Sequence, residues 1–106
     1  DESVDVKMKK LAISIGDLNG VGIEIALKSH NEVKKICKPI YCINKNMLQQ
    51  ASSMLNIKVE DDFEICEVGE NFEIKPSEIS ALSGKYSYDS FIKAIELAQN
   101  NIVDGV

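Results

Sequence analysis

A glycine-rich turn near the start of the sequence carries the side chains best suited to bind a ligand. The apolar run 11–15 leads directly into Gly-Asp-Leu-Asn-Gly-Val-Gly-Ile-Glu at residues 16–24. Glycines let backbone N–H groups approach a ligand closely, and the start of a helix attracts anionic groups. Asp17 and Glu24 could accept hydrogen bonds from ligand hydroxyls, whereas the Asn19 amide could donate or accept. The alternative is a plain strand-to-helix turn in which Asp17 or Asn19 only caps the helix.

The spacing of these glycines is G-x-x-x-G-x-G. It is neither the dinucleotide fingerprint G-x-G-x-x-G nor the phosphate loop G-x-x-x-x-G-K-[ST]. The motif alone therefore assigns the chain to neither of these nucleotide-binding classes.

A second candidate for ligand binding is Ser83-Gly84-Lys85-Tyr86-Ser87. A lysine beside a glycine and hydroxyl groups, close to the start of a helix, could hold a phosphate group. We therefore name Lys85 as a candidate contact to a substrate phosphate. The alternative is an exposed loop in which Ser87 or Asp89 caps the last helix.

The histidine and cysteine content argues against a metal site built from this segment alone. His30 is the single histidine, and it falls within a predicted helix. A catalytic metal site needs several protein ligands, so we predict a surface histidine or a core histidine with satisfied hydrogen bonds. The three cysteines include no C-x-x-C pair. We interpret Cys42 and Cys66, which lie in apolar runs, as small reduced hydrophobes typical of a cytoplasmic protein.

Composition excludes some classes of partner. The 106 residues carry a formal net charge of -5, and every positive side chain is a lysine. Because binding to a phosphate backbone depends on clustered basic residues, we expect no nucleic-acid partner. Apolar runs stay far below the roughly 20 residues of a membrane span, so we expect no membrane partner. Residues 1–7 precede Met8-Lys9-Lys10 and are interpreted as a leader or cleavage scar outside the fold.

Apolar periodicity predicts strands alternating with helices. The expected strands are 11–15, 40–43, which follows a break at Pro39, and 63–68, whereas 70–82 reads as irregular. The expected helices are 21–36, a shorter one capped by Asn44 or Asn46 with Met47, Leu48, Ala51, Met54 and Leu55, and a last one with an apolar stripe at Phe91, Ile95, Ala98 and Ile102.

This alternation predicts an α/β fold with three layers, α/β/α, and a mostly parallel sheet. The sequence stops at Asp104-Gly105-Val106, where the last helix should turn into a further strand. We therefore expect residues 8–106 to be the amino-terminal part of a larger α/β domain.

The two motifs together resemble a known family. A strand, then Gly-Asp-x-x-Gly-x-Gly-x-Glu, then a helix, close to Met8, is similar to the start of 4-hydroxythreonine-4-phosphate dehydrogenase. Ser83-Gly84-Lys85-Tyr86-Ser87, with the helix that ends in Asn-Ile-Val-Asp-Gly-Val, is similar to the segment before the central strand of that family. This pyridoxine-pathway enzyme has a fold related to isocitrate and isopropylmalate dehydrogenases. Leu18 and Ile23 depart from the family, which usually has prolines there.

The resemblance implies a function for the whole protein. It implies a cytoplasmic homodimer that uses NAD and a divalent metal to oxidise 4-phosphooxy-L-threonine, a small phosphorylated amino acid. The resulting 3-oxo acid would lose carbon dioxide to give 3-amino-2-oxopropyl phosphate, in pyridoxal phosphate biosynthesis. The metal would be held by three histidines downstream of this segment, so no catalytic or metal residue is expected here and the segment alone should be inactive. The residues implied to border the cofactor are Gly16, Asp17, Asn19, Gly20, Gly22 and Glu24.

Two other functions stay open at this point. A β-decarboxylating hydroxy-acid dehydrogenase would share a similar glycine-rich opening, although its usual Gly-Asp-Gly turn is shorter. A small α/β ligand-binding module, complete in itself, would unfold cooperatively as a single unit.

Overall fold

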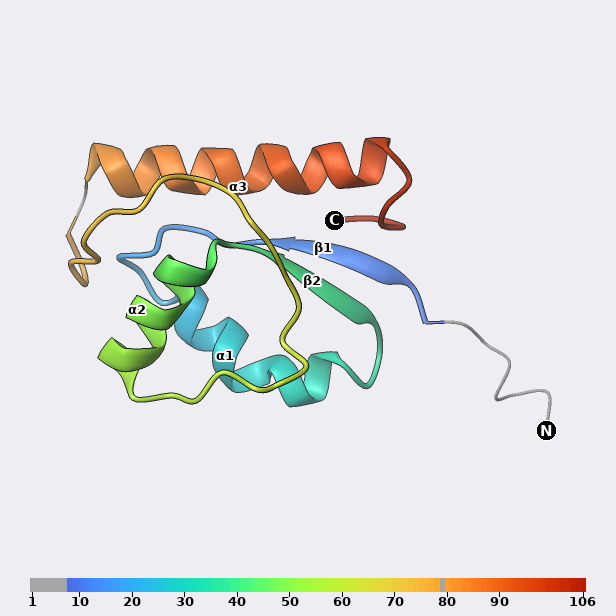
Figure 1. Cartoon of the computed structure of the whole chain (residues 1–106), viewed down its shortest axis with the longest axis horizontal. Coiled ribbons are helices and arrows are strands. Elements are labelled where there is room, and N and C mark those ends of the chain that lie inside the picture. Colours follow the sequence, from blue (N-terminus) through green and yellow to red (C-terminus); the bar gives the residue numbers. More distant parts are fainter. Residues whose placement is uncertain (1–7, 79) are drawn as a thin grey trace.

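Parallel strands form the middle layer of the molecule. The computed structural model describes residues 8–78 and 80–106, and within them the three-stranded sheet has the order β1-β2-β3. Helices α1 and α2 cover one face of this sheet, and α3 lies along the other face (Figure 1). The three-layer α/β/α prediction is thus confirmed. The elements are β1 (Lys10–Ser14), α1 (Gly22–Val33), β2 (Lys38–Cys42), α2 (Lys45–Leu55), β3 (Ile65–Cys66) and α3 (Ala81–Gln99).

The strands pair to unequal extents. All of β1 pairs with β2, from Lys10↔Lys38 to Ser14↔Cys42. The third strand was predicted over 63–68 but pairs with β2 only at Ile65 and Cys66. On its other edge, β1 forms an isolated parallel bridge with Gly105: the Ala12 N–H donates to the Gly105 carbonyl oxygen at 2.9 Å.

Pro39 was expected to precede the second strand but lies inside β2, opposite Leu11. The strand tolerates it because successive N–H groups point to opposite sides. The Lys38 N–H donates toward β1, to the Lys9 carbonyl oxygen, so the Pro39 nitrogen faces the side of β3. Pairing with β3 begins only at Tyr41, so the missing N–H removes no sheet hydrogen bond.

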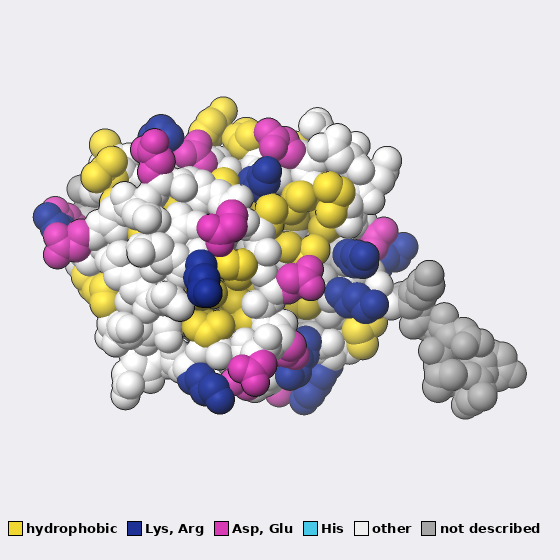
Figure 2. Space-filling view, in the orientation of Figure 1, with side chains coloured by type: hydrophobic (Ala, Val, Ile, Leu, Met, Phe, Trp, Pro, Cys, Tyr) yellow, Lys and Arg dark blue, Asp and Glu magenta, His cyan; other side chains and the backbone are white. Residues whose placement is uncertain are grey.

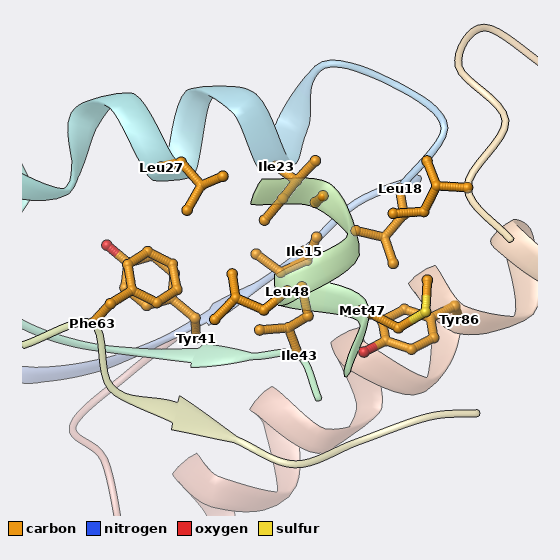
Figure 3. Close-up of a cluster of buried hydrophobic side chains, with 12 residues drawn as sticks. Ile15, Leu18, Ile23, Leu27, Tyr41, Ile43, Met47, Leu48, Phe63 and Tyr86 are labelled. Atoms are coloured by element: carbon orange, nitrogen blue, oxygen red, sulfur yellow. The ribbon is translucent and has the colours of Figure 1, made fainter. Parts of the chain in front are cut away.

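The larger core lies between the sheet and the helices α1 and α2 (Figure 3). The rings of Tyr41 and Phe63 stack with centroids 3.9 Å apart. Leu18 of the glycine-rich turn and Tyr86 of α3 also point into this cluster, so the turn is anchored by its own apolar side chain. The buried members are Ile15, Leu18, Ile23, Leu27, Tyr41, Ile43, Met47, Leu48, Ala51, Phe63, Ile74 and Tyr86.

The smaller core lies between the sheet and α3, and there the predicted helix face was wrong. Phe91 of the expected stripe is 49 % exposed, and Ile102 lies beyond the helix. The buried face is offset by one position, because small side chains let α3 lie close to Ala12 and Cys42 of the sheet. Its buried residues are Ser83, Tyr86, Ser90, Ala94 and Leu97.

The surface mixes charges of both signs. Figure 2 shows lysine and carboxylate side chains interspersed over one face, with hydrophobic patches between them. Within residues 8–78 and 80–106, no helix is both long enough and apolar enough to cross a membrane.

Candidate ligand site at the glycine-rich turn

The turn after β1 is closed by its own hydrogen bonds. The Asp17 carboxylate accepts from the Asn19 N–H at 2.8 Å, and the Asp17 carbonyl oxygen accepts from the Gly20 N–H at 2.9 Å. A Cβ at Gly20 would lie 3.2 Å from that carbonyl oxygen, which explains the glycine there. Helix α1 begins after Val21, and among the described residues no side chain caps it. The expectation that Asp17 or Asn19 caps this helix was therefore wrong.

A hollow of about 320 Å³ lies against the turn. One wall comes from the turn and the start of α1, a second from the end of α2, and a third from the segment around Pro76. Most of these side chains are apolar, with a few polar groups at the margin, which is the usual make-up of a small-molecule pocket. The lining residues are Leu18, Asn19, Gly20, Val21, Ile23, Glu24, Ala51, Met54, Leu55, Ile74, Pro76 and Ser77.

The structure divides five of the six turn residues singled out from the sequence between two hollows, and the sixth, Asp17, is not among the lining residues of either. Asn19, Gly20 and Glu24 line the 320 Å³ hollow. Gly16 and Gly22 line another, of about 210 Å³, bounded by β1, α1 and Tyr41. No protein atom lies within 4 Å of a Cβ built at Gly16, so among the described residues its side faces open space.

Glu24 is the charged group of the hollow. Its side chain is partly exposed, and Oε2 lies 2.6 Å from the Lys28 Nζ one helical turn later. Because an exposed pair within one helix is weak, a polar ligand group could compete for this carboxylate.

Sequence reasoning missed how the third wall is held. Asn19 is buried and bonds through its side chain to Lys75 and Glu78, and Gln50 of α2 bonds to Phe72 and Ile74. These contacts link segments that are far apart in the sequence, so periodicity gives no signal for them. The only sequence signal for this contact is an asparagine in a turn together with an irregular segment that contains a proline.

Residues 83–87 were expected to precede the last helix, but they lie inside it, and the phosphate contact of Lys85 stays a prediction. Lys85 belongs to the first turns of α3 rather than to a loop, and Ser80 caps this helix by accepting from the Ser83 N–H at 3.1 Å. Neither Ser87 nor Asp89 is the cap. The Lys85 Nζ lies 2.9 Å from the Asp89 carboxylate, which raises the pKa of the lysine. The buried Ser83 hydroxyl instead donates back to the Ser80 carbonyl oxygen, so it is not joined with Lys85 in one cradle.

Of the two alternatives predicted for His30, a surface histidine or a core histidine with satisfied hydrogen bonds, the structure shows the second. The His30 Nδ1 lies 2.8 Å from the Tyr41 hydroxyl and the His30 Nε2 lies 2.9 Å from the Asp62 carboxylate. The Lys34 ammonium, and after it His30, lower the pKa of Asp62. Burial raises the pKa of Tyr41 to about 12. Over residues 8–78 and 80–106, no group of three histidine, cysteine or acidic side chains is arranged to hold a metal ion.

The fold and the turn define a class. A parallel sheet with helices on both faces and a hollow beyond the carboxyl end of a strand is the arrangement of the doubly wound α/β folds. A solved structure with this fold is that of a 4-hydroxythreonine-4-phosphate dehydrogenase from Burkholderia phymatum. It matches with a TM-score of 0.74 and 21 % identity, over 92 % of this chain and 35 % of that chain.

Sequence comparison points to the same name. No family model matches the chain. Two proteins named 4-hydroxythreonine-4-phosphate dehydrogenase, from Sulfurimonas denitrificans and Campylobacter fetus, are 57 % identical over 97 residues and 55 % identical over 95 residues. These matches cover 92 % and 90 % of this chain but 32 % and 31 % of the relatives. The chain thus spans about a third of the length of these relatives, and it resembles the amino-terminal portion of 4-hydroxythreonine-4-phosphate dehydrogenase.

Proposed function

We propose that this chain is the amino-terminal part of an NAD-dependent, divalent-metal-requiring 4-hydroxythreonine-4-phosphate dehydrogenase. The whole enzyme would oxidise 4-phosphooxy-L-threonine to a 3-oxo acid, which decarboxylates to 3-amino-2-oxopropyl phosphate in pyridoxal phosphate biosynthesis. The observation that supports this most strongly is the 57 % identity over 97 residues to a protein of that name. We also propose that the whole enzyme is a homodimer in the cytoplasm.

The hollow at the turn is large enough for one ring of a dinucleotide but not for the whole dinucleotide. Its 320 Å³ is at the small end of ligand pockets, which span about 300–1,000 Å³. Val21 and Ile23 on one side and Met54 on the other would hold a flat ring between apolar surfaces. Glu24 at the margin would accept a hydrogen bond from a ligand hydroxyl. NAD, when bound, accepts the hydride, and these residues would bind and orient it and exclude water.

The metal is expected outside this segment. Among the described residues His30, the one histidine of the sequence, is engaged with Tyr41 and Asp62 and is not available as a ligand. We therefore assign no step of the metal chemistry to this chain. We also propose that Lys85 contacts the phosphate of the substrate, for which its ammonium group would have to leave the Asp89 carboxylate.

The activity is tested with the full-length protein that contains this sequence. We expect reduction of NAD when 4-phosphooxy-L-threonine and a divalent cation are both present, and loss of turnover on chelation. Isopropylmalate and isocitrate serve as matched substrates for the β-decarboxylating alternative. Turnover of either of these, with none of 4-phosphooxy-L-threonine, would overturn the proposal. The 106-residue chain alone should be inactive.

The role of the hollow is tested by filling it. Met54→Trp places a large side chain at its margin, so the KM for NAD should rise several-fold with little change in stability. Ile36→Trp adds the same bulk at a position that is 78 % exposed and outside the hollow, and it should leave the KM unchanged. An unchanged KM for NAD in Met54→Trp would contradict the proposal that a ring of NAD binds in this hollow.

A further inference from the structure

We infer that Asn19 is a positioning residue: it holds residues 72–78, here called the strap, against the glycine-rich turn and so sets the width of the hollow. This inference rests on the proposed function, in which the hollow holds a ring of NAD. The residues that carry it are Asn19 in the turn and Gln50 in α2, which hold the same strap at different points.

The strap is irregular in structure, so its backbone depends on side chains for hydrogen bonds. Asn19 provides three hydrogen bonds, two through its side-chain amide and one through its backbone carbonyl. Its Oδ1 accepts from the Lys75 N–H at 2.7 Å, and its Nδ2 donates to the Glu78 carbonyl oxygen at 2.9 Å. Its own carbonyl oxygen accepts from the Ser77 N–H at 2.7 Å. Asn19 is only 4 % exposed, so these hydrogen bonds are shielded from water.

Gln50 grips the strap at its other end. Its Oε1 accepts from the Ile74 N–H, and its Nε2 donates to the Phe72 carbonyl oxygen at 2.9 Å. The difference between the two amides lies in what they adjoin. Asn19 lines the hollow together with Pro76 and Ser77, whereas Gln50 is not among the lining residues described for it. Gln50 is therefore the matched control: its own side chain is not among those lining residues, although it bonds the backbone of Ile74, which is.

The backbone at Ser77 shows that this wall needs holding. Its φ is +65°, in the left-handed region that side chains disfavour by about 1–2 kcal/mol. The Ser77 N–H donates to the backbone carbonyl oxygen of Asn19, and the side-chain bonds of Asn19 to Lys75 and Glu78 flank Ser77 on both sides. Removing the Asn19 side chain would free this part of the strap to relax and so widen the hollow.

The test compares Asn19→Ala with Gln50→Ala in the full-length protein. We expect Asn19→Ala to raise the KM for NAD about tenfold with kcat nearly unchanged, which corresponds to one lost set of positioning hydrogen bonds. Gln50→Ala should lower the urea midpoint about as much as Asn19→Ala does, and it should leave the KM for NAD within about twofold of the parent value. Equal increases of KM in both variants, or none in Asn19→Ala, would show that Asn19 is merely structural.

Hydrogen exchange without ligand separates this inference from the proposed function. In Asn19→Ala the Lys75 amide should exchange faster while the Ile74 amide is unchanged, and Gln50→Ala should do the reverse. If the full-length protein does not reduce NAD, the proposed function fails, and unchanged Lys75 exchange alone would still overturn the role of Asn19. If Asn19→Ala does not fold, Asn19→Asp replaces it. This variant keeps the acceptor for the Lys75 N–H and should raise the KM for NAD by a smaller factor.

Discussion

The two faces of the sheet are built on different principles. On the α1 and α2 face, large aliphatic and aromatic side chains interdigitate, and the candidate ligand hollow lies at their margin. On the α3 face, the contact is made by Ala12, Cys42 and Ala94, and the central polar contact is the hydroxyl of Ser90. That hydroxyl donates to the Cys42 carbonyl oxygen at 2.7 Å and accepts from the Ile15 N–H at 2.9 Å. Packing on the α1 and α2 face therefore depends on side-chain volume. Packing on the α3 face depends on close approach of small side chains and on hydrogen bonds.

This difference makes the two faces sensitive to different substitutions. A truncation leaves a cavity on the first face, whereas loss of a single oxygen atom leaves two buried backbone groups unpaired on the second. In the described part of the chain, every buried side-chain nitrogen or oxygen has a hydrogen-bond partner. The helix α3 is thus held in register by polar contacts that tolerate little change.

The largest effect is expected on the face specified by volume. Ile43 is fully buried, so Ile43→Ala should lower the free energy of unfolding by about 2–5 kcal/mol. Urea unfolding followed by circular dichroism measures this change. The control is Ile25→Ala on α1, which is 59 % exposed and should change stability by less than about 0.5 kcal/mol. Similar effects of the two substitutions would contradict the packing described for this face.

The next effect tests the hydrogen-bonded face. Ser90→Ala removes one oxygen atom and leaves the Ile15 N–H and the Cys42 carbonyl oxygen without their partner. We expect a loss of about 2 kcal/mol in the same unfolding experiment. Ser87→Ala, one turn earlier on α3 and only half-buried, should change stability by less than about 0.5 kcal/mol. If Ser90→Ala were neutral, the two faces would not differ in the way proposed.

A smaller effect on stability is expected at Tyr86, which belongs to α3 but packs in the larger core and so connects the two faces. Its hydroxyl accepts from the Asn44 N–H at 2.8 Å, so Tyr86→Phe should lower stability by about 1 kcal/mol. Unfolding at neutral pH measures this loss. A variant as stable as the parent would mean that the bond to Asn44 adds nothing.

Alkaline pH gives the same residue a second readout. Burial raises the pKa of both Tyr41 and Tyr86 from 10.0 to about 12. The protonated phenol is favoured in the folded state, so this stability is fully present below pH 10 and is lost as the pH rises toward 12. Unfolding midpoints measured across this range should fall, and Tyr86→Phe should fall less steeply. Parallel curves would contradict the burial of the Tyr86 hydroxyl.

The smallest effect on stability is expected at Lys85. Its ion pair with Asp89 is exposed, so Lys85→Ala should leave the urea midpoint unchanged within error. If Lys85 contacts the substrate phosphate, the same variant should raise the KM for 4-phosphooxy-L-threonine and not that for NAD. An unchanged KM would end the role proposed for this lysine.

Elements with a local signal could be predicted from the sequence. The strand β1, the helix α1 and the Asn44 cap of α2 all follow from periodicity and capping rules. The buried face of α3 could not be predicted in the same way, because serine reads as a surface residue. The burial of Ser90 depends on Cys42 and Ile15, which are 48 and 75 residues away.

The candidate site shows the same limit. The turn at 16–24 stands out by its glycines, and the sequence correctly predicted that a helix follows it. The wall opposite could not be predicted, because Asn19 bonds to Lys75 across 56 residues and the strap has no periodic pattern. Whether the turn binds a cofactor is still a prediction for both of the hollows that it borders.

The way in which β1 is paired has a consequence for synthesis. One edge of β1 pairs with the nearby β2, but on the other edge Lys10 donates to Asp104, 94 residues away. On the ribosome the β1–β2 pair can form early, whereas the second edge stays open until Gly105 has left the exit tunnel. An open parallel edge can recruit strands from neighbouring nascent chains. The speed of translation through α3 therefore governs how long this edge of β1 stays open on the ribosome.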